Sequence, residues 1–510
     1  MIGPGIGSWP ARRARMNPST VALCTDTEEL TYTELAGRVE HTAARLRELG
    51  VSHGTRVAYL GPNSIDTWVC FFATARAGGI FVSLNIRLAA PEIGYMLADS
   101  GSHLLVHGPE CAELAAAAEP VEHGVARVVP AADLRPSGPP GAAAGSPYAI
   151  VEGEPVELDD PVLILYTSGT TGRPKGAVLT HGNLTWNTVN QLAHVDVLST
   201  DVALCVAPLF HVTGLGQVSM PTLLKGGTVV VVPKFDAGAF LALIARRRAT
   251  GFSAVPTMLQ MMCEHPDWVS ADLSSLRYVI YGGSPIAAQV AQAWLDRGVV
   301  VQQGYGMTEA SPGVFMALPD GAASRPVSAG VPHFFTDVRL DAEGEPVVGA
   351  GRGELLVRGP HVFAGYWGRP EETAQVVEDG WYRSGDVVRI EDDGWAYVVD
   401  RVKDMIISGG ENIYPAEVEM AIAELSDVTA AAVVAVPDAT WGEVGCAYVV
   451  LRTGADLDEI ALRAHLEQRL ARYKIPRYVE LCDELPRNAT GKVLRSVLRE
   501  RALLDHPAAP

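Results

Sequence analysis

Tyr166-Thr-Ser-Gly-Thr-Thr-Gly-Arg-Pro-Lys175-Gly176 is the segment that says most about the fold of this chain. It directly follows an apolar run, 162–165, of the kind found in buried strands. Glycines let the loop backbone curl so that its N–H groups point inward, while the hydroxyls and Lys175 add donors and positive charge. The segment therefore predicts a polyphosphate-binding loop after a strand, with a plain surface turn as the alternative. It is not the P-loop of NTPases, because Gly176 follows Lys175 where that motif has Ser or Thr.

Apolar runs typical of strands alternate with helical stretches on both sides of this loop. Strands are expected at 56–60, 103–107, 162–167, 228–232 and 276–281. A helix is predicted before Gly50, capped by Thr33, because apolar residues recur there at helical spacing. Strands that alternate with helices predict an α/β fold with largely parallel sheets.

The pattern changes after Gly330, where short strands separated by glycine turns predict a β-rich subdomain. A final unit that mixes helices and strands begins near Arg401. We therefore expect a large N-terminal domain, 1–400, with two α/β subdomains and the β-rich subdomain, and a small mobile α+β domain, 401–510. The stretch 131–147, rich in Ala, Pro and Gly, is interpreted as a surface loop.

Composition excludes several classes of function. The chain has 40 Lys and Arg against 59 Asp and Glu, a net charge of −19, which argues against nucleic acid as a partner. Its 7 cysteines are dispersed and form no CxxC pair, so neither a disulfide framework nor a zinc site is indicated. The charge-free stretch 202–224 contains prolines and glycines, which argues against a membrane helix. With no signal peptide recognisable either, a cytoplasmic protein is expected.

Five further motifs follow the loop in order. They are Pro208-Leu-Phe-His211-Val-Thr-Gly214, Gly304-Tyr-Gly-Met-Thr308-Glu309, Tyr382-Arg-Ser-Gly-Asp386, Asp400-Arg401-Val-Lys403-Asp404-Met-Ile-Ile-Ser-Gly409-Gly410-Glu411 and Pro486-Arg-Asn-Ala-Thr-Gly491-Lys492. With the loop, they resemble the motifs of the adenylate-forming superfamily, which includes acyl-CoA synthetases, peptide-synthetase adenylation domains and luciferases. The resemblance spans nearly the whole chain and is greatest to ligases of fatty or other apolar acids.

The resemblance implies a set of residues that bind ATP. Thr308 would offer its hydroxyl to the α-phosphate, and Glu309 is a hard oxygen ligand suited to Mg²⁺. Asp386, in a Gly-flanked turn, would accept the ribose hydroxyls, and Arg401 would add a second contact. The full implied set is Thr167, Ser168, Gly169, Thr170, Thr171, Gly172, Lys175, Gly283, Ser284, Pro285, Gly304, Tyr305, Gly306, Met307, Thr308, Asp386, Arg401 and Lys492.

The resemblance also gives two lysines near the C-terminus a part in catalysis, alongside Thr308 and His211. Lys492 would bridge the acid carboxylate and the α-phosphate, whose mutual repulsion opposes their reaction. Lys403 would lie at the pivot about which the small domain turns between the two half-reactions. Taken alone, each would be an ordinary solvated lysine.

The acid pocket would be lined by 211–217, 255–258, 282–284 and 304–307, with the acyl group meeting His211, Gly214, Val255, Gly282, Gly304, Gly306 and Met307. These stretches hold no Arg, Lys or Asp, so an apolar monocarboxylic acid, fatty, alicyclic or aryl, fits better than a dicarboxylate or an amino acid. The small residues Gly214, Gly216 and Gly304 favour a deep tunnel. His211 is interpreted as a gate or a carboxylate contact, with a satisfied core histidine as the alternative.

Coenzyme A is expected as the acceptor, so that the reaction forms an acyl-adenylate and then a thioester. Its contacts would be Ser408, Gly409, Gly410, Trp441, Arg472 and Lys474. Ordinary packing of Trp441 and solvated charges at Arg472 and Lys474 are the alternative. Transfer to an amine or a carrier protein would use the same ATP motifs, and a non-catalytic nucleotide- or acyl-binding regulator is a third possibility. The chain length of the acid, the pathway and the oligomeric state do not follow from the sequence.

Overall fold

The computed structural model describes residues 5–118, 120–122, 124–137, 154–167, 174–283, 286–342, 344–401, 404–408, 411–438, 441–470, 472–488 and 491–506. Backbone contacts divide the chain into two compact units. Unit 1 comprises Met1–Asp337 and Val357–Tyr382, and unit 2 comprises Val338–Leu356 and Arg383–Pro510. The border expected at residue 400 stays a prediction.

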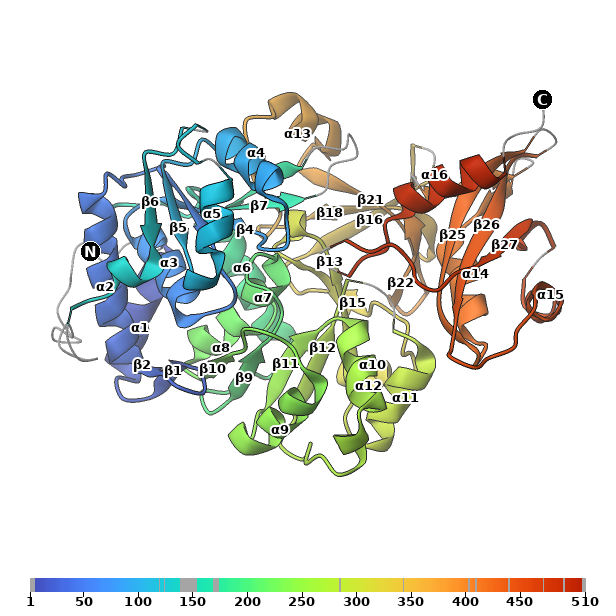
Figure 1. Cartoon of the computed structure of the whole chain (residues 1–510), viewed down its shortest axis with the longest axis horizontal. Helices are drawn as coiled ribbons and strands as arrows, with labels where there is room; N and C mark the ends of the chain where they lie inside the picture. Colours follow the sequence, from blue (N-terminus) through green and yellow to red (C-terminus); the bar gives the residue numbers. More distant parts are fainter. Residues whose placement is uncertain are drawn as a thin grey trace. The chain divides into compact units, whose positions relative to one another are not determined.

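Two mixed sheets form the framework of unit 1 (Figure 1). The first has seven strands, parallel at its centre, in the order β19 (Gly365–Tyr366), β8 (Lys175–Thr180), β7 (Pro161–Thr167), β4 (Ile80–Leu84), β3 (Arg56–Leu60), β5 (Leu104–His107) and β6 (Arg127–Pro130). The second has nine, in the order β15 (Val331–Pro332), β14 (Gly313–Met316), β13 (Val301–Gly306), β12 (Tyr278–Tyr281), β11 (Gly251–Ala254), β9 (Val202–Cys205), β10 (Thr228–Val231), β1 (Val21–Cys24) and β2 (Glu29–Thr31). The five strands expected from the sequence are confirmed within two residues at either end.

Helices separate and cover these sheets. They are α1 (Trp9–Met16), α2 (Tyr32–Glu48), α3 (Ile65–Arg76), α4 (Ala90–Ser100), α5 (Ala112–Ala117), α6 (His181–His194), α7 (Val212–Gly216), α8 (Ser219–Lys225), α9 (Ala237–Arg247), α10 (Pro256–Glu264), α11 (Ala288–Asp296), α12 (Pro319–Ala322) and α13 (Pro370–Val376), with short 3₁₀ helices η1 (Ile6–Ser8), η2 (Pro109–Cys111), η3 (Ala131–Leu134), η4 (Pro266–Val269) and η5 (Thr308–Ala310). The stretch 202–224 is a strand followed by two short helices, and none of the described helices is long and apolar enough to cross a membrane.

The cap of α2 differs from the sequence expectation. Thr31, not Thr33, caps the helix: its side chain accepts a hydrogen bond from the Glu34 N–H, and Glu34 accepts one from the Thr31 N–H. The expectation was wrong because two threonines lie close together in this segment. Only Thr31 has a Glu three residues later, and a Thr and a Glu at that spacing form a capping box. Thr33 lies inside the first turn and donates instead to the carbonyl of Pro18.

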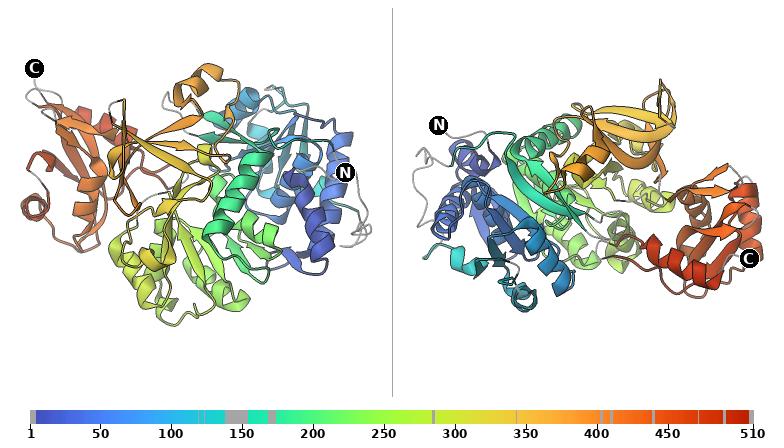
Figure 2. Two further views of the ribbon diagram at one scale, coloured as in Figure 1. Left: turned by 180° about the vertical axis from the view of Figure 1, so that it is seen from behind. Right: turned by 90° about the horizontal axis from the view of Figure 1, so that it is seen from above.

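Three apolar layers hold unit 1 together. Figure 2 shows the same ribbon from two further sides. The largest lies between the sheets and includes residues of both, together with α2, α3 and α8. The strands alternate as expected for sheets buried on both faces: Tyr278 and Ile280 join this middle layer, while Val279 and Tyr281 pack with α9, α10 and α11. The third layer joins α4 and α5 to the seven-stranded sheet.

Unit 2 begins with the predicted β-rich segment. Its strands pair in the order β17 (Glu345–Val347), β16 (Asp337–Ala342), β18 (Gly351–Arg358) and β21 (Trp381–Ile390), with β22 (Ala396–Arg401) on β21. The short β20 (Val377–Glu378) forms a hairpin with the start of β21 and is grouped with unit 1. The chain passes from one unit to the other inside β16, β18 and β21.

The rest of unit 2 is one sheet with helices on both faces. Its strands are β24 (Glu411–Ile413), β23 (Ile406–Ser408), β26 (Gly442–Leu451), β25 (Val428–Asp438) and β27 (Tyr478–Leu481), and its helices are α14 (Pro415–Ala423), α15 (Glu459–Glu467), α16 (Arg495–Asp505) and the 3₁₀ helix η7 (Arg472–Lys474). Along β25, Val433 and Ala435 pack with α14 and α15, whereas Ala432, Val434 and Val436 pack with α16. The fold is therefore α/β, with a large N-terminal part and a small C-terminal α+β part, as predicted, while backbone contacts group most of the β-rich segment with the C-terminal part.

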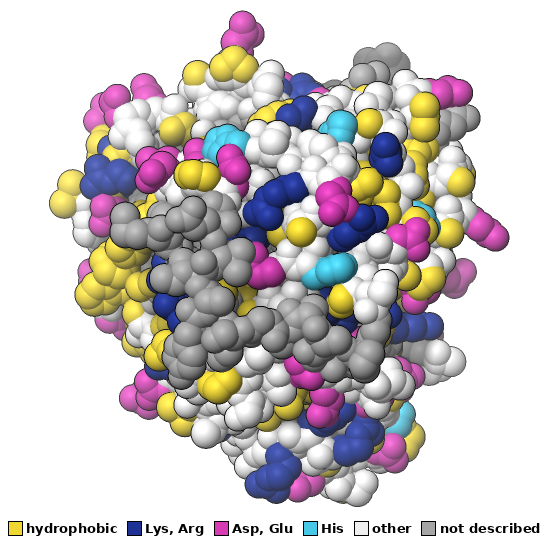
Figure 3. Space-filling view, turned by 90° about the vertical axis from the view of Figure 1, so that its left-hand side faces the viewer, with side chains coloured by type: hydrophobic (Ala, Val, Ile, Leu, Met, Phe, Trp, Pro, Cys, Tyr) yellow, Lys and Arg dark blue, Asp and Glu magenta, His cyan; other side chains and the backbone are white. Residues whose placement is uncertain are grey.

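Charged side chains of both signs are interspersed on the face of the molecule drawn in Figure 3. No basic stripe of the kind that tracks a nucleic-acid backbone gathers there among the described residues.

Candidate functional site

The loop 168–174 connects two paired strands of unit 1. Thr167 at the end of β7 and Lys175 at the start of β8 are partners in the antiparallel ladder, so both ends of the predicted phosphate loop are fixed by the sheet. The Lys175 ammonium pairs with the Glu372 carboxylate of α13 and lies 5.4 Å from the centre of the Tyr366 ring. The lysine that is predicted to bind phosphate is therefore already in contact with a carboxylate and an aromatic face.

The carboxylate that holds Lys175 belongs to a wider polar network. Arg369 donates to Glu372 at 3.1 Å and to Asp99 of α4 at 2.8 Å, and Tyr166 donates to the other oxygen of Asp99 at 2.8 Å. The Lys175 ammonium, followed by Arg369, holds the pKa of Glu372 below its usual value. Glu372 thus stays ionised at neutral pH and remains a partner for Lys175.

Tyr366 connects Lys175 with the predicted magnesium ligand. Its hydroxyl donates to Oε1 of Glu309 at 2.9 Å, while its ring faces Lys175. Burial and the neighbouring Glu309 carboxylate raise the pKa of Tyr366, so the hydroxyl keeps its proton and remains a donor. Glu309 lies in η5 directly after Thr308, is buried, and accepts the Phe363 N–H at its backbone carbonyl. The structure therefore brings Lys175, Thr308 and Glu309 into one region of unit 1.

Sequence reasoning missed Tyr366, Arg369 and Glu372. They lie at the end of β19, directly before α13 and in α13, about 190 residues after Lys175 in the chain. Their nearness to the loop depends on β19 adding to the edge of β8, with Tyr366 opposite Ala177. A two-residue strand leaves no periodic pattern, so only the tertiary structure reveals this pairing.

The predicted acid-lining stretches converge at one edge of the nine-stranded sheet. Val255 and Gly282 directly follow the parallel strands β11 and β12, and Gly304 lies near the end of β13. A Cβ added at Gly282 would lie 2.9 Å from the Gly304 carbonyl oxygen, and one added at Gly283 would lie 4.0 Å from Cγ1 of Val255. The carboxyl ends of parallel strands are where α/β proteins bind ligands. We call Val255, Gly282 and Gly304, together with Gln217, the acid wall.

Gln217 joins the acid wall from the end of α7. Its amide Nε2 lies 2.5 Å from where a Cβ of Gly304 would stand, so a side chain at 304 would displace the amide. Gln217 is 6% exposed, and its Oε1 is buried without a hydrogen-bond donor in the part of the chain that the structure describes.

His211 precedes α7, opposite Gln217 along this short helix. Its Nε2 is buried and has no hydrogen-bond partner among the described residues. Burial, and secondarily the positive charge of Arg87, lowers the pKa of His211 to about 4. The imidazole is therefore neutral at pH 7, which suits a gate or a hydrogen-bonding contact and not an ion pair with a carboxylate.

Three of the predicted glycines are required by packing within the chain itself. A Cβ at Gly214 would lie 2.4 Å from the Pro208 carbonyl oxygen, and one at Gly216 would lie 2.7 Å from the Ser311 carbonyl oxygen. At Gly306 the Pro312 carbonyl oxygen would be 1.6 Å away. Because the space beside Gly214 and Gly216 is filled by backbone, these residues give no support to the expectation of a deep tunnel.

Asn187 of α6 ties the acid wall to the loop that carries Thr308 and Glu309. This fully buried amide donates to the Gly216 carbonyl at 2.9 Å and accepts the Gly313 N–H at 3.2 Å. One side chain thus fixes the end of α7 relative to the segment after η5. A single Asn within a helix carries no sequence signal for such a part.

In unit 2 the two predicted ribose contacts are neighbours. Asp386 and Arg401 are directly opposite each other in the β21–β22 ladder. Asp386 is buried and lies inside β21, so its expected place in a turn is wrong. Gly385 has a positive φ of 71° within the strand, and the Asp386 N–H donates to the Ser384 hydroxyl, which lets β21 continue through the Ser-Gly pair.

The described residues predicted to contact coenzyme A lie near one another in unit 2. Ser408 at the end of β23 pairs with Gly442, next to Trp441, which is 52% exposed. The helix η7, which holds Arg472 and Lys474, packs against β24. The Lys474 ammonium contacts Glu417 of α14 at 2.6 Å, so it is an ion-paired side chain and not merely a solvated charge.

The apolar neighbours of Lys492 and those of Ser408 and Lys474 pack on opposite faces of the small sheet. Lys492 is exposed on a hairpin in which Arg487 pairs with Val493, and Val493 packs with the α16 layer. Ile406 and Ile475, beside the predicted coenzyme contacts, pack with the α14 layer instead. Within unit 2, the residue next to Lys492 and the residues next to Ser408 and Lys474 therefore pack on different faces of the sheet.

Several predicted site residues lie outside the described residues, and their roles stay predictions. They are Ser168, Gly169, Thr170, Thr171, Gly172, Ser284, Pro285, Lys403, Gly409 and Gly410, together with the side chain of Arg401.

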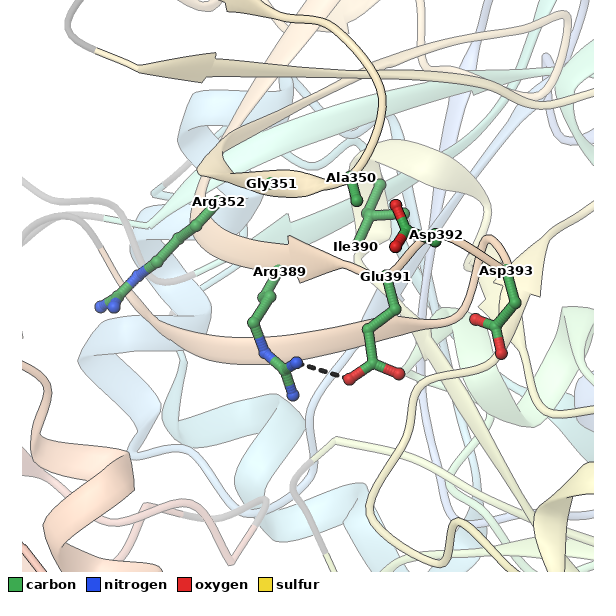
Figure 4. Close-up of a pocket in the computed structure, with 8 residues that line it drawn as sticks. All are labelled: Ala350, Gly351, Arg352, Arg389, Ile390, Glu391, Asp392 and Asp393. Atoms are coloured by element: carbon green, nitrogen blue, oxygen red, sulfur yellow. Dashed lines mark hydrogen bonds and ion pairs between the residues drawn. The ribbon is translucent and has the colours of Figure 1, made fainter.

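An open groove of 660 Å³ in unit 2 lies between the start of β18 and the turn after β21. Figure 4 shows Arg389 paired with Glu391 at 2.5 Å, while Arg352 points away from this pair. The groove contains none of the residues predicted from the motifs.

The chain matches known proteins along almost its whole length. A profile described as "AMP-binding enzyme" matches residues 10–367, and one described as "AMP-binding enzyme C-terminal domain" matches residues 417–492. A feruloyl-CoA synthase from Amycolatopsis sp. is 52% identical over 98% of this chain and 100% of the relative. An indoleacetate–CoA ligase from Aromatoleum aromaticum is 41% identical over 97% and 98%.

Solved structures agree with this assignment. The o-succinylbenzoate CoA synthetase of Bacillus subtilis, in complex with its acyl-adenylate intermediate, has a TM-score of 0.85 and 32% identity over 96% of this chain and 98% of that chain. The AMP-binding profile alone covers more than half of the sequence, in the region that holds Lys175, the acid wall and Glu309. The chain belongs to the AMP-binding enzyme family.

Proposed function

We propose that this protein is an ATP-dependent carboxylate–CoA ligase that activates an aryl or other apolar monocarboxylic acid. In the first half-reaction the carboxylate attacks the α-phosphate of ATP, which gives an acyl-adenylate and pyrophosphate. In the second, the thiol of coenzyme A attacks the acyl carbonyl and AMP leaves. The observation that carries the proposal is the 52% identity to a feruloyl-CoA synthase over 98% of this chain and 100% of the relative.

Residues of unit 1 would bind the nucleotide and orient the acid. Lys175 and the loop before it are suited to the β- and γ-phosphates, and Thr308 to the α-phosphate. Glu309 would hold Mg²⁺, which offsets the negative charge of the phosphates, and a buried carboxylate next to a tyrosine hydroxyl fits this use. Lys492 of unit 2 would stabilise the charge that develops when the carboxylate attacks.

The acid wall supports an apolar substrate. Glycine and apolar side chains dominate it, and the Arg or Lys that a second carboxylate would need is absent from its described residues. Among relatives, the names feruloyl-CoA synthase and indoleacetate–CoA ligase both describe aromatic acids. We therefore favour an aryl acid over a long fatty acid.

Coenzyme A is the proposed acceptor because two of its predicted contacts are neighbours, with Ser408 paired to Gly442 beside Trp441, and a third, Lys474, is held by Glu417 of α14. Transfer to an amine or a carrier protein is the second candidate, since it would use the same nucleotide residues. The cytoplasmic location stays a prediction.

The test incubates the purified protein with ATP, Mg²⁺ and a panel of aryl, alicyclic and fatty acids, with and without coenzyme A. We expect acid-dependent pyrophosphate release, and acyl-CoA in the mass spectrum only when coenzyme A is present. Pyrophosphate release without thioester, but with amide formed from added amines, would support the second candidate. No acid-dependent pyrophosphate release from any acid would contradict the ligase assignment.

A further inference from the structure

We propose that Gln217 is a specificity-determining residue that accepts a hydrogen bond from a donor group on the ring of the acid substrate. The inference rests on the proposed function, because it concerns the acid that the ligase activates. It narrows the substrate class from apolar aryl acids to aryl acids that carry a phenolic hydroxyl or a ring N–H.

The first observation is a buried acceptor without a donor. Gln217 is 6% exposed, and its Oε1 has no hydrogen-bond partner in the described part of the chain. Burial of an amide oxygen without a donor typically costs about 1–3 kcal/mol, so buried polar groups are nearly always paired. A glutamine in this state is best explained by a partner that arrives with the ligand.

The second observation is the position of that amide. Its Nε2 lies 2.5 Å from the point where a Cβ of Gly304 would stand, and Gly304 lies beside Gly282 at the carboxyl ends of β13 and β12. The amide therefore lies against the acid wall, where a ligand is expected.

The third observation is the chemistry of the surroundings. Asn187 donates a hydrogen bond to the Gly216 carbonyl and so holds in place the end of α7, next to Gln217. The other members of the acid wall, Val255, Gly282 and Gly304, contribute no side-chain donor that could satisfy Oε1. A neutral amide acceptor in such a wall selects a neutral donor on the substrate, that is, a hydroxyl or a ring N–H.

Fatty acids do not meet this requirement, because an alkyl chain would leave the buried oxygen unpaired. A feruloyl group carries a phenolic hydroxyl and an indole ring carries an N–H, and relatives named for both are 52% and 41% identical to this chain. A site built to hydrogen-bond a substrate group discriminates against the analogue without it much more strongly than a purely apolar pocket can.

The experiment compares 4-hydroxycinnamate with cinnamate, which differ only in the phenolic hydroxyl. We measure kcat/KM for acid-dependent pyrophosphate exchange in the wild-type protein and in Gln217→Leu. The wild type should favour the hydroxylated acid by about 10-fold to 100-fold, the range expected for one buried hydrogen bond. Gln217→Leu should lower kcat/KM for 4-hydroxycinnamate by a similar factor and leave that for cinnamate unchanged or higher.

Controls separate a recognition defect from a folding defect. Gln217→Met, which keeps the length of the side chain, should show the same loss of preference if Gln217→Leu folds poorly. Gln292→Leu makes the same chemical change at an exposed residue of α11 whose amide donates to Asp296, and should keep the wild-type preference.

Two results would overturn the inference while leaving the ligase assignment intact. One is equal use of both acids by the active wild-type protein. The other is an unchanged preference in active Gln217→Leu and Gln217→Met. Absence of exchange with every acid in the wild-type protein would instead contradict the proposed function.

Discussion

The two lysines predicted to meet ATP have very different surroundings. Lys175 in unit 1 is 13% exposed, pairs with Glu372 and lies against the ring of Tyr366, and Glu372 is in turn held by Arg369. Lys492 in unit 2 is exposed on the hairpin before α16. One cation is part of a preformed polar network, and the other lies on the surface of unit 2.

This difference suggests different parts in the reaction. A lysine held by a carboxylate contributes mainly to binding the phosphates in the ground state, and a phosphate must compete with Glu372 for it. If unit 2 turns between the half-reactions, as the family resemblance implies, a lysine on its hairpin would approach only for one step and would act mainly in the transition state, where stabilisation raises kcat.

Lys403→Pro should have the largest effect, because it would remove the predicted movement of unit 2 on which the contrast depends. Proline fixes φ near −65° and restricts the preceding residue, so a pivot at 403 could no longer turn. Pyrophosphate exchange should survive, while coenzyme-dependent thioester formation falls to background. The two half-reactions are measured separately, by exchange of labelled pyrophosphate and by thioester formed from synthetic acyl-adenylate.

Lys403→Ala is the matched control for that variant. It removes the side chain and leaves φ free, so both half-reactions should continue if only the backbone matters. Equal loss or equal retention of both halves in Lys403→Pro would remove the pivot assignment.

Lys492→Ala should slow adenylate formation by about 10²–10³ in kcat, the usual cost of losing one transition-state contact. The KM for ATP should change little, and synthetic acyl-adenylate should restore thioester formation. Lys225→Ala, at an exposed lysine that ends α8, serves as the control and should behave like the wild type. Adenylation at the wild-type rate in Lys492→Ala would show that the lysine has been misassigned.

Tyr366→Phe should raise the KM for ATP and Mg²⁺ by about 10-fold, because a hydrogen bond to a charged group contributes about 1.5–3 kcal/mol. The variant keeps the ring next to Lys175 but loses the hydroxyl that donates to Glu309. The KM for the acid should not change. In Tyr59→Phe, which alters a buried tyrosine of β3 with its hydroxyl near Ser64, all KM values should stay as in the wild type. A uniform loss across all substrates in Tyr366→Phe would indicate a structural defect instead.

Glu372→Gln should have the smallest effect, and in the opposite direction. It removes the negative charge that competes with phosphate for Lys175, so the KM for ATP should fall by about 2–5-fold, as expected for a partly exposed ion pair. Glu371→Gln removes the same charge from the neighbouring exposed residue of α13 and should have less effect. A rise in the KM for ATP would mean that Glu372 positions Lys175 for the nucleotide and does not compete with it.

Local motifs in the sequence predicted the candidate site residues, because a motif such as 304–309 needs only the end of β13 and the short η5 to place its side chains. The sequence also predicted the α/β class, because the spacing of apolar residues distinguishes strands from helices and the two alternate along the chain. Where a local choice was ambiguous it erred. Thr31 and Thr33 compete for one cap, and the Ser-Gly before Asp386 resembles a turn yet continues as a strand.

Only the tertiary structure decided which side chains meet. The contacts of Tyr366 with Glu309, of Glu372 with Lys175 and of Gln217 with the space beside Gly304 join residues 57, 197 and 87 positions apart. Such contacts depend on which strand joins which edge and on the parallel order of β11, β12 and β13. Hydrophobic periodicity fixes the face that each element buries, but it carries no information about the partner across that face, and that pairing sets the polar geometry of the site.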